Sequence, residues 1–449
     1  MTRRKQGARP GARVVGWTLA VAVALGAVPA QASLTISEAI ERAAEHDPQW
    51  AAAYTQMLAE REQGAQDRAT LMPSVTLRGS GGYTAADSEF VFGSEKDSYP
   101  TWGASIEARQ PILRMDWSAR RDRAAFSDDR ALEKLQQAQI EFIARVAQRY
   151  LQALQAQDQL ALTRAESATL EQSLDDVRKR YEVELVPGTD LKEAQAQFDL
   201  SRAQVIQAEA QLEHSFDALA ELTGAFAAPL PHLKNQIVLP PLPATSVDDW
   251  IALQKTRSPV LKMAEYDVAV AQTQVKARKA EALPVADLVA TATNNDAHRS
   301  AMGAKQREAR IGVELSVPLY AGGGNQSRVR QALAQAQSAE FEQQRLILQM
   351  ERDLRGEFRD YQAAQISVQA LEMGLDSARA AQKATHAGYD AGTRTIIDVL
   401  DAKRRVAQAE RDLNQMRYQL LTHLLLLQAG AGTLDHAMIP VLEAMFEAP

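Results

Sequence analysis

Cysteine is absent from the 449-residue sequence, and aromatic residues make up only 6% of it. The missing cysteine excludes disulfides, thiolate metal sites, cysteine nucleophiles and a lipid-modified N-terminal cysteine. The formal net charge of -7 argues against a protein that binds nucleic acid. After the N-terminal region, no stretch is apolar for the roughly 18 residues that a membrane-spanning helix needs. A bilayer crossing would therefore require a closed β-barrel.

The first 32 residues have the composition of a secretory signal peptide. Five basic residues precede an apolar run from Val14 to Ala30, and Ala30-Gln31-Ala32 is a small-x-small cleavage signal. We expect cleavage after Ala32; the alternative is a retained membrane anchor, for which the run is short. Cleavage removes five positive charges and changes the net charge from -7 to -12. The sequence thus predicts export into or beyond a bacterial periplasm.

The sequence repeats itself at a distance of about 208 residues. A ladder of apolar residues seven apart, at 191–219, recurs at 399–427. Such self-similarity indicates an internal duplication. After the signal peptide we expect a first structural repeat at 33–240, a proline-rich linker at 241–245 and a second structural repeat at 246–449.

Each repeat is expected to start with a helix, Ser37 to Ala69 and Val247 to Ala282. The expected N-caps are Ser37 in the first helix and either Ser246 or Asp248 in the second. Two strand-like runs follow in each repeat. The second run of each repeat alternates apolar with polar or small residues over nine or ten positions. That length suits a bilayer-spanning strand, although the pattern alone favours an ordinary half-buried hairpin. The expected strands are 75–83, 101–110, 285–293 and 310–318, and the expected connecting loops are Thr84–Pro100 and Asn294–Arg307.

Very long helices are expected after the strands. Residues 325–388 contain no proline, and 64 helical residues would reach about 96 Å. Apolar spacing predicts coiled-coil seams within them. The seam residues are Leu170, Leu174, Val177 and Tyr181 in the first repeat, and Leu371, Leu375 and Ala378 in the second.

Four candidate strands per chain are too few for a closed barrel of about eight strands, so several chains would have to share one barrel by cyclic symmetry.

The segment Tyr389-Asp390-Ala391-Gly392-Thr393-Arg394-Thr395-Ile396-Ile397-Asp398-Val399-Leu400-Asp401-Ala402 resembles a motif of the TolC family of outer-membrane channel proteins. Ala431-Gly432-Thr433-Leu434 and the related segment 181–190 extend the resemblance over nearly all of the mature chain. The resemblance implies a mixed α/β membrane protein that forms a homotrimeric channel-tunnel. Four strands per chain would make a shared 12-stranded transmembrane β-barrel, and long helices would make a coiled-coil barrel in the periplasm.

The same resemblance implies an exit duct in the bacterial outer membrane that extends into the periplasm. Its partners would be outer-membrane lipid, a periplasmic adaptor and an inner-membrane transporter, either ABC-type or proton-driven. We favour type I protein secretion; the alternatives are a multidrug efflux pump and a non-channel periplasmic coiled-coil adaptor. We expect no enzyme activity, cofactor or metal, because the seven histidines are scattered without metal-ligand spacing.

Two acidic residues, Asp398 and Asp401, lie three positions apart and would share one helix face. The family resemblance assigns them to the periplasmic entrance, where threefold repetition would make a cation-selective ring with raised pKa values. The alternative from spacing alone is that Thr395 caps a helix and Asp398 is its favoured third residue. Both roles can hold together.

The resemblance also implies gate contacts that close the entrance. Tyr389 and Arg394 would reach Thr189 and Asp190 of a neighbouring helical coil. One position departs from the family: Glu184 stands where the second repeat has a glycine. If the backbone there needs a positive φ, glutamate is unfavourable, and the local turn of the first repeat is less certain.

Overall fold

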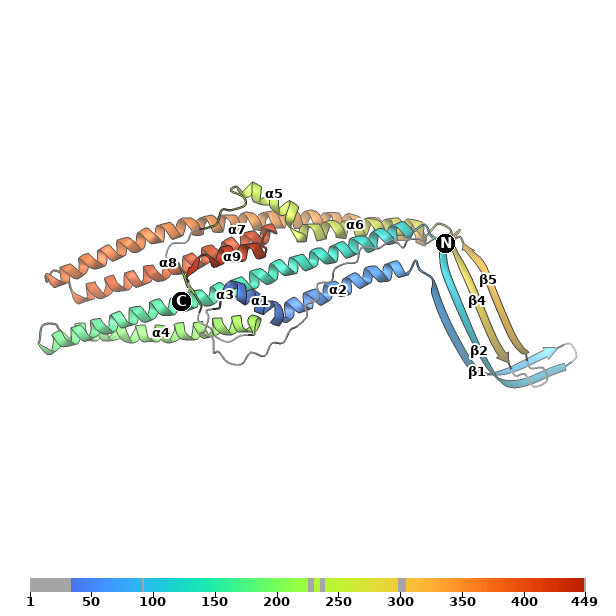
Figure 1. Ribbon diagram of the computed structural model, residues 1–449, viewed down its shortest axis with the longest axis horizontal. Coiled ribbons are helices and arrows are strands. Elements are labelled where there is room, and N and C mark those ends of the chain that lie inside the picture. The colour runs from blue at the N-terminus through green and yellow to red at the C-terminus, as the bar shows by residue number, and fades with distance from the viewer. Residues whose placement is uncertain (1–33, 91–92, 225–229, 235–238, 298–303, 448–449) are drawn as a thin grey trace, which may run out of the picture.

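The computed structural model describes residues 34–90, 93–224, 230–234, 239–297 and 304–447. The predicted signal peptide and its cleavage site after Ala32 lie outside these residues. Long helices make one elongated body, and a four-stranded sheet projects from one of its ends (Figure 1). None of the helices in the described part of the chain is both long and apolar enough to cross a membrane.

The order helix, helix, strand, strand, long helix, long helix occurs twice along the chain. The first set comprises α1 (Ile36–His46), α2 (Pro48–Ala69), β1 (Ser74–Phe90), β2 (Gly93–Leu113), α3 (Trp117–Glu182) and α4 (Gly188–Thr223). The second set comprises α5 (Val247–Arg257), α6 (Pro259–Ala280), β4 (Val285–Ala297), β5 (Ala304–Ser316), α7 (Gly324–Asp390) and α8 (Ile396–Ala431). The remaining elements are β3 (His232–Leu233), a 3-10 turn (His436–Met438), α9 (Ile439–Glu443) and β6 (Phe446–Glu447). The domain boundaries given above stay a prediction.

The expectation of one helix before each strand pair is wrong, because each of these segments consists of two helices. Asp47 has extended backbone and accepts a hydrogen bond from the amide of Gln49 at 2.9 Å, so it caps α2. Pro48 follows at the first helical position, where its missing N–H costs nothing. Ser258 and Pro259 occupy the same positions between α5 and α6. A proline also disfavours helical backbone in the residue before it, so each Asp-Pro or Ser-Pro pair ends one helix and starts the next.

The N-cap expectations are partly correct. Thr35, and not Ser37, caps α1. Ser37 instead donates its hydroxyl to Oε2 of Glu443 at 2.9 Å, which ties α1 to α9. Ser246 caps α5, and Asp248 lies in the first turn. The C-terminal part of the chain therefore holds the helix at the start of the described residues.

The sheet has the order β1-β2-β4-β5, and all neighbouring strands are antiparallel. The predicted loop Thr84–Pro100 is wrong, since the register of β1 with β2 continues from Ser74 opposite Arg109 as far as Phe90 opposite Gly93. Backbone hydrogen bonds alone can extend such a ladder, so the strands stay paired at their polar end although the sequence there does not alternate. The loop predicted at 294–307 is also too long, because β4 reaches Ala297 and β5 begins at Ala304; residues 298–303 lie outside the described part.

The two faces of the sheet differ in polarity. The register places Arg109 beside Glu107, Asp287 and Glu314 on one face, and Arg109 forms ion pairs with all three. The opposite face carries large apolar side chains that remain exposed among the residues described. The residues Val75, Leu77, Ile311, Val313 and Leu315 on this face are 64–75% exposed. An apolar face of this kind excludes the half-buried hairpin that sequence alternation alone favoured.

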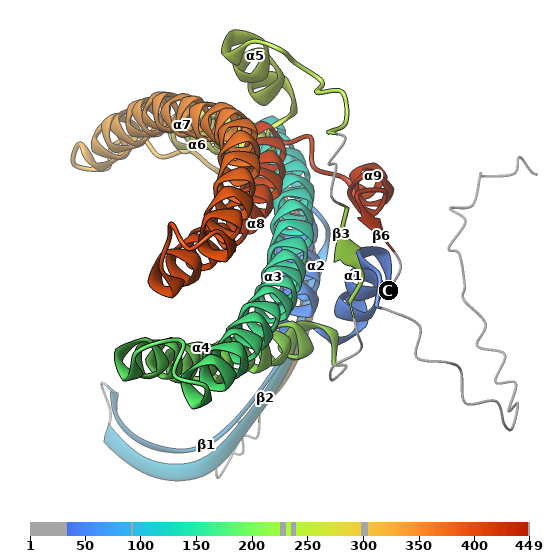
Figure 2. The ribbon, with the colours of Figure 1, turned by 90° about the vertical axis from the view of Figure 1, so that its left-hand side faces the viewer.

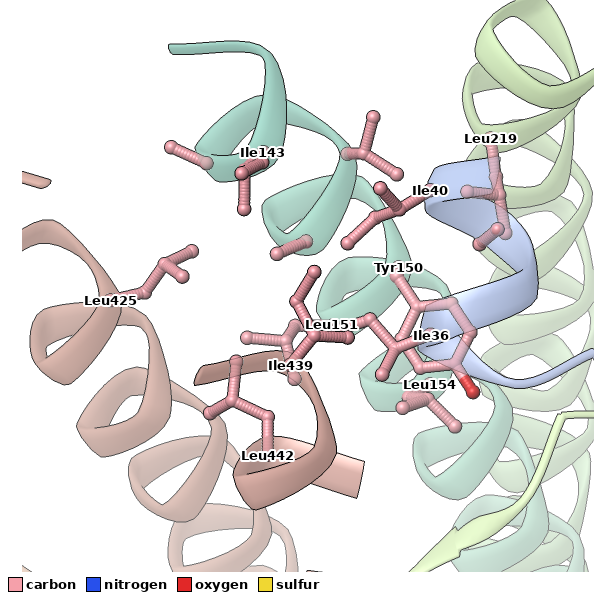
Figure 3. Packing of buried hydrophobic residues seen from close by; sticks show 14 of the residues in the cluster. Ile36, Ile40, Ile143, Tyr150, Leu151, Leu154, Leu219, Leu425, Ile439 and Leu442 are labelled. Carbon is pink, nitrogen blue, oxygen red and sulfur yellow. The ribbon is translucent and has the colours of Figure 1, made fainter. Parts of the chain in front are cut away.

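The long helices form one curved layer (Figure 2). Near the end away from the sheet, α3 packs between α4 and α8, and α7 packs on α8. The helices α1, α5 and α9 lie on the convex side of this layer (Figure 2). The main apolar core joins α1, α3, α4, α8 and α9 at mid-length (Figure 3). In the same region β3 pairs with β6, so that residues from the end of the first repeat contact the C-terminal end of the described chain.

Candidate functional site

Two helical hairpins end together at the end of the molecule opposite the sheet (Figure 1). One turn joins α3 to α4, and the other joins α7 to α8. An apolar cluster packs α3, α4 and α8 against one another beside these turns. Three residues of the predicted seam, Leu170, Leu174 and Val177, are buried in it, whereas Tyr181 is exposed. The two tips therefore form one packed unit rather than two free hairpins.

The two turns are built alike. Each holds one residue in the left-handed conformation, Glu184 with φ of 60° and Gly392 with φ of 74°. This pattern is a Schellman-type C-cap, which favours glycine at the left-handed position. Position 184 thus does require a positive φ, and among the residues described Glu184 is alone in having one without being glycine. The paired bonds run from Glu184 N to Tyr181 O, Leu185 N to Arg180 O and Gly392 N to Tyr389 O, each 2.9 Å, and from Thr393 N to Gly388 O, 2.8 Å.

Asp398 takes part in the cap at the start of α8. Its backbone N–H donates to Oγ1 of Thr395 at 3.2 Å, and its carboxylate accepts from the backbone N–H of Thr395 at 2.8 Å. These bonds form the capping box that the spacing allowed. Hydrogen bonds from Thr395 lower the pKa of Asp398, and the nearby charge of Arg394 lowers it further. Within one chain the carboxylate is therefore kept ionised, which is opposite to the rise expected from a ring of like charges.

Asp401 lies one turn further along α8 and is partly exposed. Its Oδ1 accepts a hydrogen bond from Arg404 at 2.9 Å, an i,i+3 ion pair on the helix surface. Exposed pairs of this kind are weak, so the pair leaves much of the acidic character of this helix face in place. Asp398 and Asp401 together present two carboxylates at the hairpin tip.

The predicted gate residues divide between the two tips. Tyr389 packs partly buried against the apolar cluster, and its hydroxyl is buried without a hydrogen-bond partner among the residues described. Thr189 donates to Oδ1 of Asp190 at 3.4 Å. Within the described chain, no hydrogen bond or ion pair joins Arg394 or Tyr389 to Thr189 or Asp190. Contacts between these groups would therefore have to come from a second chain, as the resemblance implies, or from a different closed arrangement.

Polar contacts between α3 and α8 were not foreseen from the sequence. Arg411 forms an ion pair with Glu166, and both side chains are largely buried. Nearer the tip, the ammonium of Lys403 donates to Oγ of Ser173 at 2.7 Å, and its burial lowers the pKa of the Lys403 ammonium. These partners lie more than 200 residues apart and share no motif, so only the three-dimensional packing identifies them.

The family model described as outer membrane efflux protein matches residues 39–225 and 250–433. The chain is 30% identical over 422 residues to the outer membrane protein TolC of Vibrio cholerae serotype O1, covering 93% of this chain and 95% of that protein. It is 28% identical to the alkaline protease secretion protein AprF of Pseudomonas aeruginosa, covering 92% of this chain and 88% of that protein.

A solved structure shares the architecture. The outer-membrane channel OprN superposes with a TM-score of 0.76 at 20% identity and covers 89% of this chain and 90% of that chain. At this identity the likeness concerns the fold alone. It confirms the mixed α/β architecture with long helices that the sequence predicted.

Proposed function

Because the chain belongs to the outer membrane efflux protein family, we propose that it forms the exit duct of a tripartite export system. Its location is the bacterial outer membrane, as its relatives are outer-membrane proteins. Its family and relatives are transport proteins and not enzymes.

The observation that carries the proposal is the uncovered apolar face of the sheet. Its opposite face bears the ion-pair network around Arg109. Strands that are apolar outside and polar inside are the pattern of membrane-spanning barrels. We therefore assign the apolar face to outer-membrane lipid and the charged face to a water-filled lumen.

Among the described residues of a single chain, neither edge of this sheet is paired. β1 and β5 are the edge strands, and an uncovered edge exposes unpaired N–H and C=O groups. In a threefold assembly, β5 of one chain pairs with β1 of the next, which closes twelve strands into a ring. The helical layer has matching free edges at α4 and α7. Exposed apolar side chains on these edges are Leu200 and Ile206 on α4, and Phe341, Leu348, Ile366 and Met373 on α7.

The entrance lies at the two hairpin tips in this proposal. Three copies of Asp398 and Asp401 would line it as six carboxylates, which attract cations and repel anions. Arg394 and Tyr389 of one coil would contact Asp190 and Thr189 of the neighbouring coil in the closed state. Separation of these coils opens the duct. A periplasmic adaptor and an inner-membrane transporter, of the ABC or proton-driven kind, would dock at this end and supply the energy.

For the cargo we favour type I protein secretion. The support is the similarity, over most of both chains, to a protein named for alkaline protease secretion. Multidrug efflux is the second candidate, and it is favoured by the family description itself. The cargo is selected by the transporter and adaptor, so the duct alone is compatible with both.

A deletion strain tests the proposal. We expect loss of a secreted protein from the culture medium with little change in drug sensitivity. Restored drug resistance on complementation, with secretion unaffected throughout, would favour efflux instead. Recovery of the protein wholly in the soluble periplasm would exclude the duct and leave only a periplasmic coiled-coil role.

A further inference from the structure

Three side chains with metal-ligating atoms meet between α7 and α8. Glu357 and Asp360 lie one turn apart on α7, and His423 lies opposite them on α8. One ligand atom from each lies within 4.8 Å of the other two. Nδ1 of His423 is 2.6 Å from Oε1 of Glu357. The sequence spacing of the histidines did not show this cluster, because its carboxylates come from another helix.

The surroundings of the cluster are apolar on one side and open on the other. His423 interrupts a leucine-rich run of α8 in which its neighbours Leu421, Leu424 and Leu425 are fully buried. Glu357 also lines a groove of about 450 Å³ between α3, α7 and α8. The ligands thus stand on two packed helices, with Glu357 facing the groove and Asp360 exposed to solvent.

The charge of the cluster is not balanced by protein cations. In the described part of the chain, no lysine or arginine forms an ion pair with Glu357 or Asp360. His423 is the ion-pair partner of Glu357, with side chains 30% and 22% exposed. A single histidine can offset at most one carboxylate, and only when it is protonated. A divalent cation would balance both carboxylates and leave the imidazole neutral.

The first repeat serves as an internal comparison. The residues 208 positions before Glu357, Asp360 and His423 are Arg149, Gln152 and Ser215. The buried aromatic residues Tyr150 and Phe358, which follow Arg149 and Glu357, are also 208 positions apart. All three first-repeat residues line one groove. That set has a cation and no carboxylate, so it cannot bind a metal ion. The ligand set is therefore a property of the second repeat and not of the shared helix packing.

We infer that Glu357, Asp360 and His423 form a binding site for a divalent transition-metal ion, and Zn²⁺ fits it best. One imidazole nitrogen and two carboxylates are ligands that zinc accepts, at about 2.0–2.2 Å from the ion. Three atoms up to 4.8 Å apart can all be about 2.8 Å from a common centre. Side-chain rotation must therefore bring each ligand atom about 0.7 Å closer to that centre to reach the zinc–ligand distance. Water completes the coordination. The bound ion links α7 to α8 at mid-length, far from the hairpin tips.

Zinc binding to the purified, untagged trimer in detergent tests the site, because a polyhistidine tag would itself bind zinc. We expect isothermal titration with ZnCl₂ to show one saturable site per chain with a Kd of about 10 μM or tighter. His423→Gln and Asp360→Asn should each weaken binding at least about tenfold. Asp360 is exposed, so Asp360→Asn leaves the helix packing intact and keeps the test valid if His423→Gln folds poorly.

His214→Gln is the matched control. His214 is exposed on α4 beside the corresponding groove of the first repeat, where no carboxylate set is present. Zinc affinity should be unchanged in this variant. The absence of saturable binding in the wild type, or an equal loss in His214→Gln and His423→Gln, would overturn the site. Neither outcome bears on the export function.

Discussion

The guanidinium of Arg180 lies over the ring of Tyr389, 5.0 Å from its centre. The two residues belong to the last turns of α3 and α7, so this cation–π contact joins the tips of the two hairpins within one chain. Such contacts contribute about 0.5–1 kcal/mol at exposed sites. The ring is held by this contact and by the apolar cluster, while its hydroxyl remains without a partner among the residues described. Because the hydroxyl is buried within the chain, a hydrogen bond from Tyr389 to another chain requires the tip to rearrange.

Replacing Arg394 by alanine should raise the conductance of the channel. In the proposed closed state, Arg394 contacts the neighbouring coil, and each ~1.4 kcal/mol lost from that state raises the open-to-closed ratio about tenfold. Single-channel recording in planar bilayers measures this. Arg352→Ala, which removes an exposed arginine paired with the adjacent Asp353, is the control and should conduct like the wild type. An Arg394→Ala channel that stays closed would remove this residue from the gate.

Asp398→Asn combined with Asp401→Asn should reduce cation selectivity. Asparagine keeps a side-chain oxygen for the cap at Thr395 but removes the charge, so the variant separates the ring from the capping box. Reversal potentials in asymmetric KCl should move toward zero. Asp376 lies on the exposed surface of α7, away from the hairpin tip, so Asp376→Asn should leave the reversal potentials unchanged. Unaltered selectivity in the double variant would mean that these carboxylates do not line the entrance.

Glu184→Gly should stabilise the first hairpin tip. A non-glycine residue in the left-handed conformation costs about 1 kcal/mol, and glycine removes that strain. The second repeat already has glycine in the same turn, which shows that the geometry accepts it. Thermal unfolding in detergent would detect the higher Tm. Glu182→Gly, the last helical residue of α3, should instead lower the Tm, since glycine is a poor helix former. A lower Tm for Glu184→Gly would point to a favourable contact of this carboxylate.

Glu166→Ala should destabilise the seam between α3 and α8 by about 3 kcal/mol, because it leaves the buried guanidinium of Arg411 without its partner. Replacing both residues, Glu166→Leu with Arg411→Met, should cost much less, since no buried charge remains. Denaturant unfolding of the three proteins gives the comparison. Equal losses in the single and double variants would show that the pair contributes through packing rather than charge.

The strands and long helices could be predicted because their patterns are local. The alternation over 310–318 and the proline-free length of α7 depend only on neighbouring positions. The same reasoning missed the break at Asp47-Pro48, although the motif is visible in the sequence. It also mistook the polar half of β1 and β2 for a loop, since a ladder of backbone hydrogen bonds does not require an apolar face.

The tip site was predictable in part for a related reason. The capping box at Thr395 and Asp398 follows from their spacing. A positive φ at Glu184 could be stated only as a condition, from the glycine in the second repeat, and the structure shows that the condition holds. The contact of Arg180 with Tyr389 and the pair of Glu166 with Arg411 join residues more than 200 positions apart. No periodicity connects such residues, so only the packing of one repeat on the other reveals them.

The short pairing of β3 with β6 has a consequence for the order of events during biogenesis. Leu233 lies opposite Phe446, so this strand pairing cannot form until nearly the whole described chain has been exported. Until then, the core around Tyr150 lacks the packing of α9 and Phe446. A first repeat without these C-terminal residues would therefore leave part of its core open, so completion of the first repeat's core depends on the end of the second repeat.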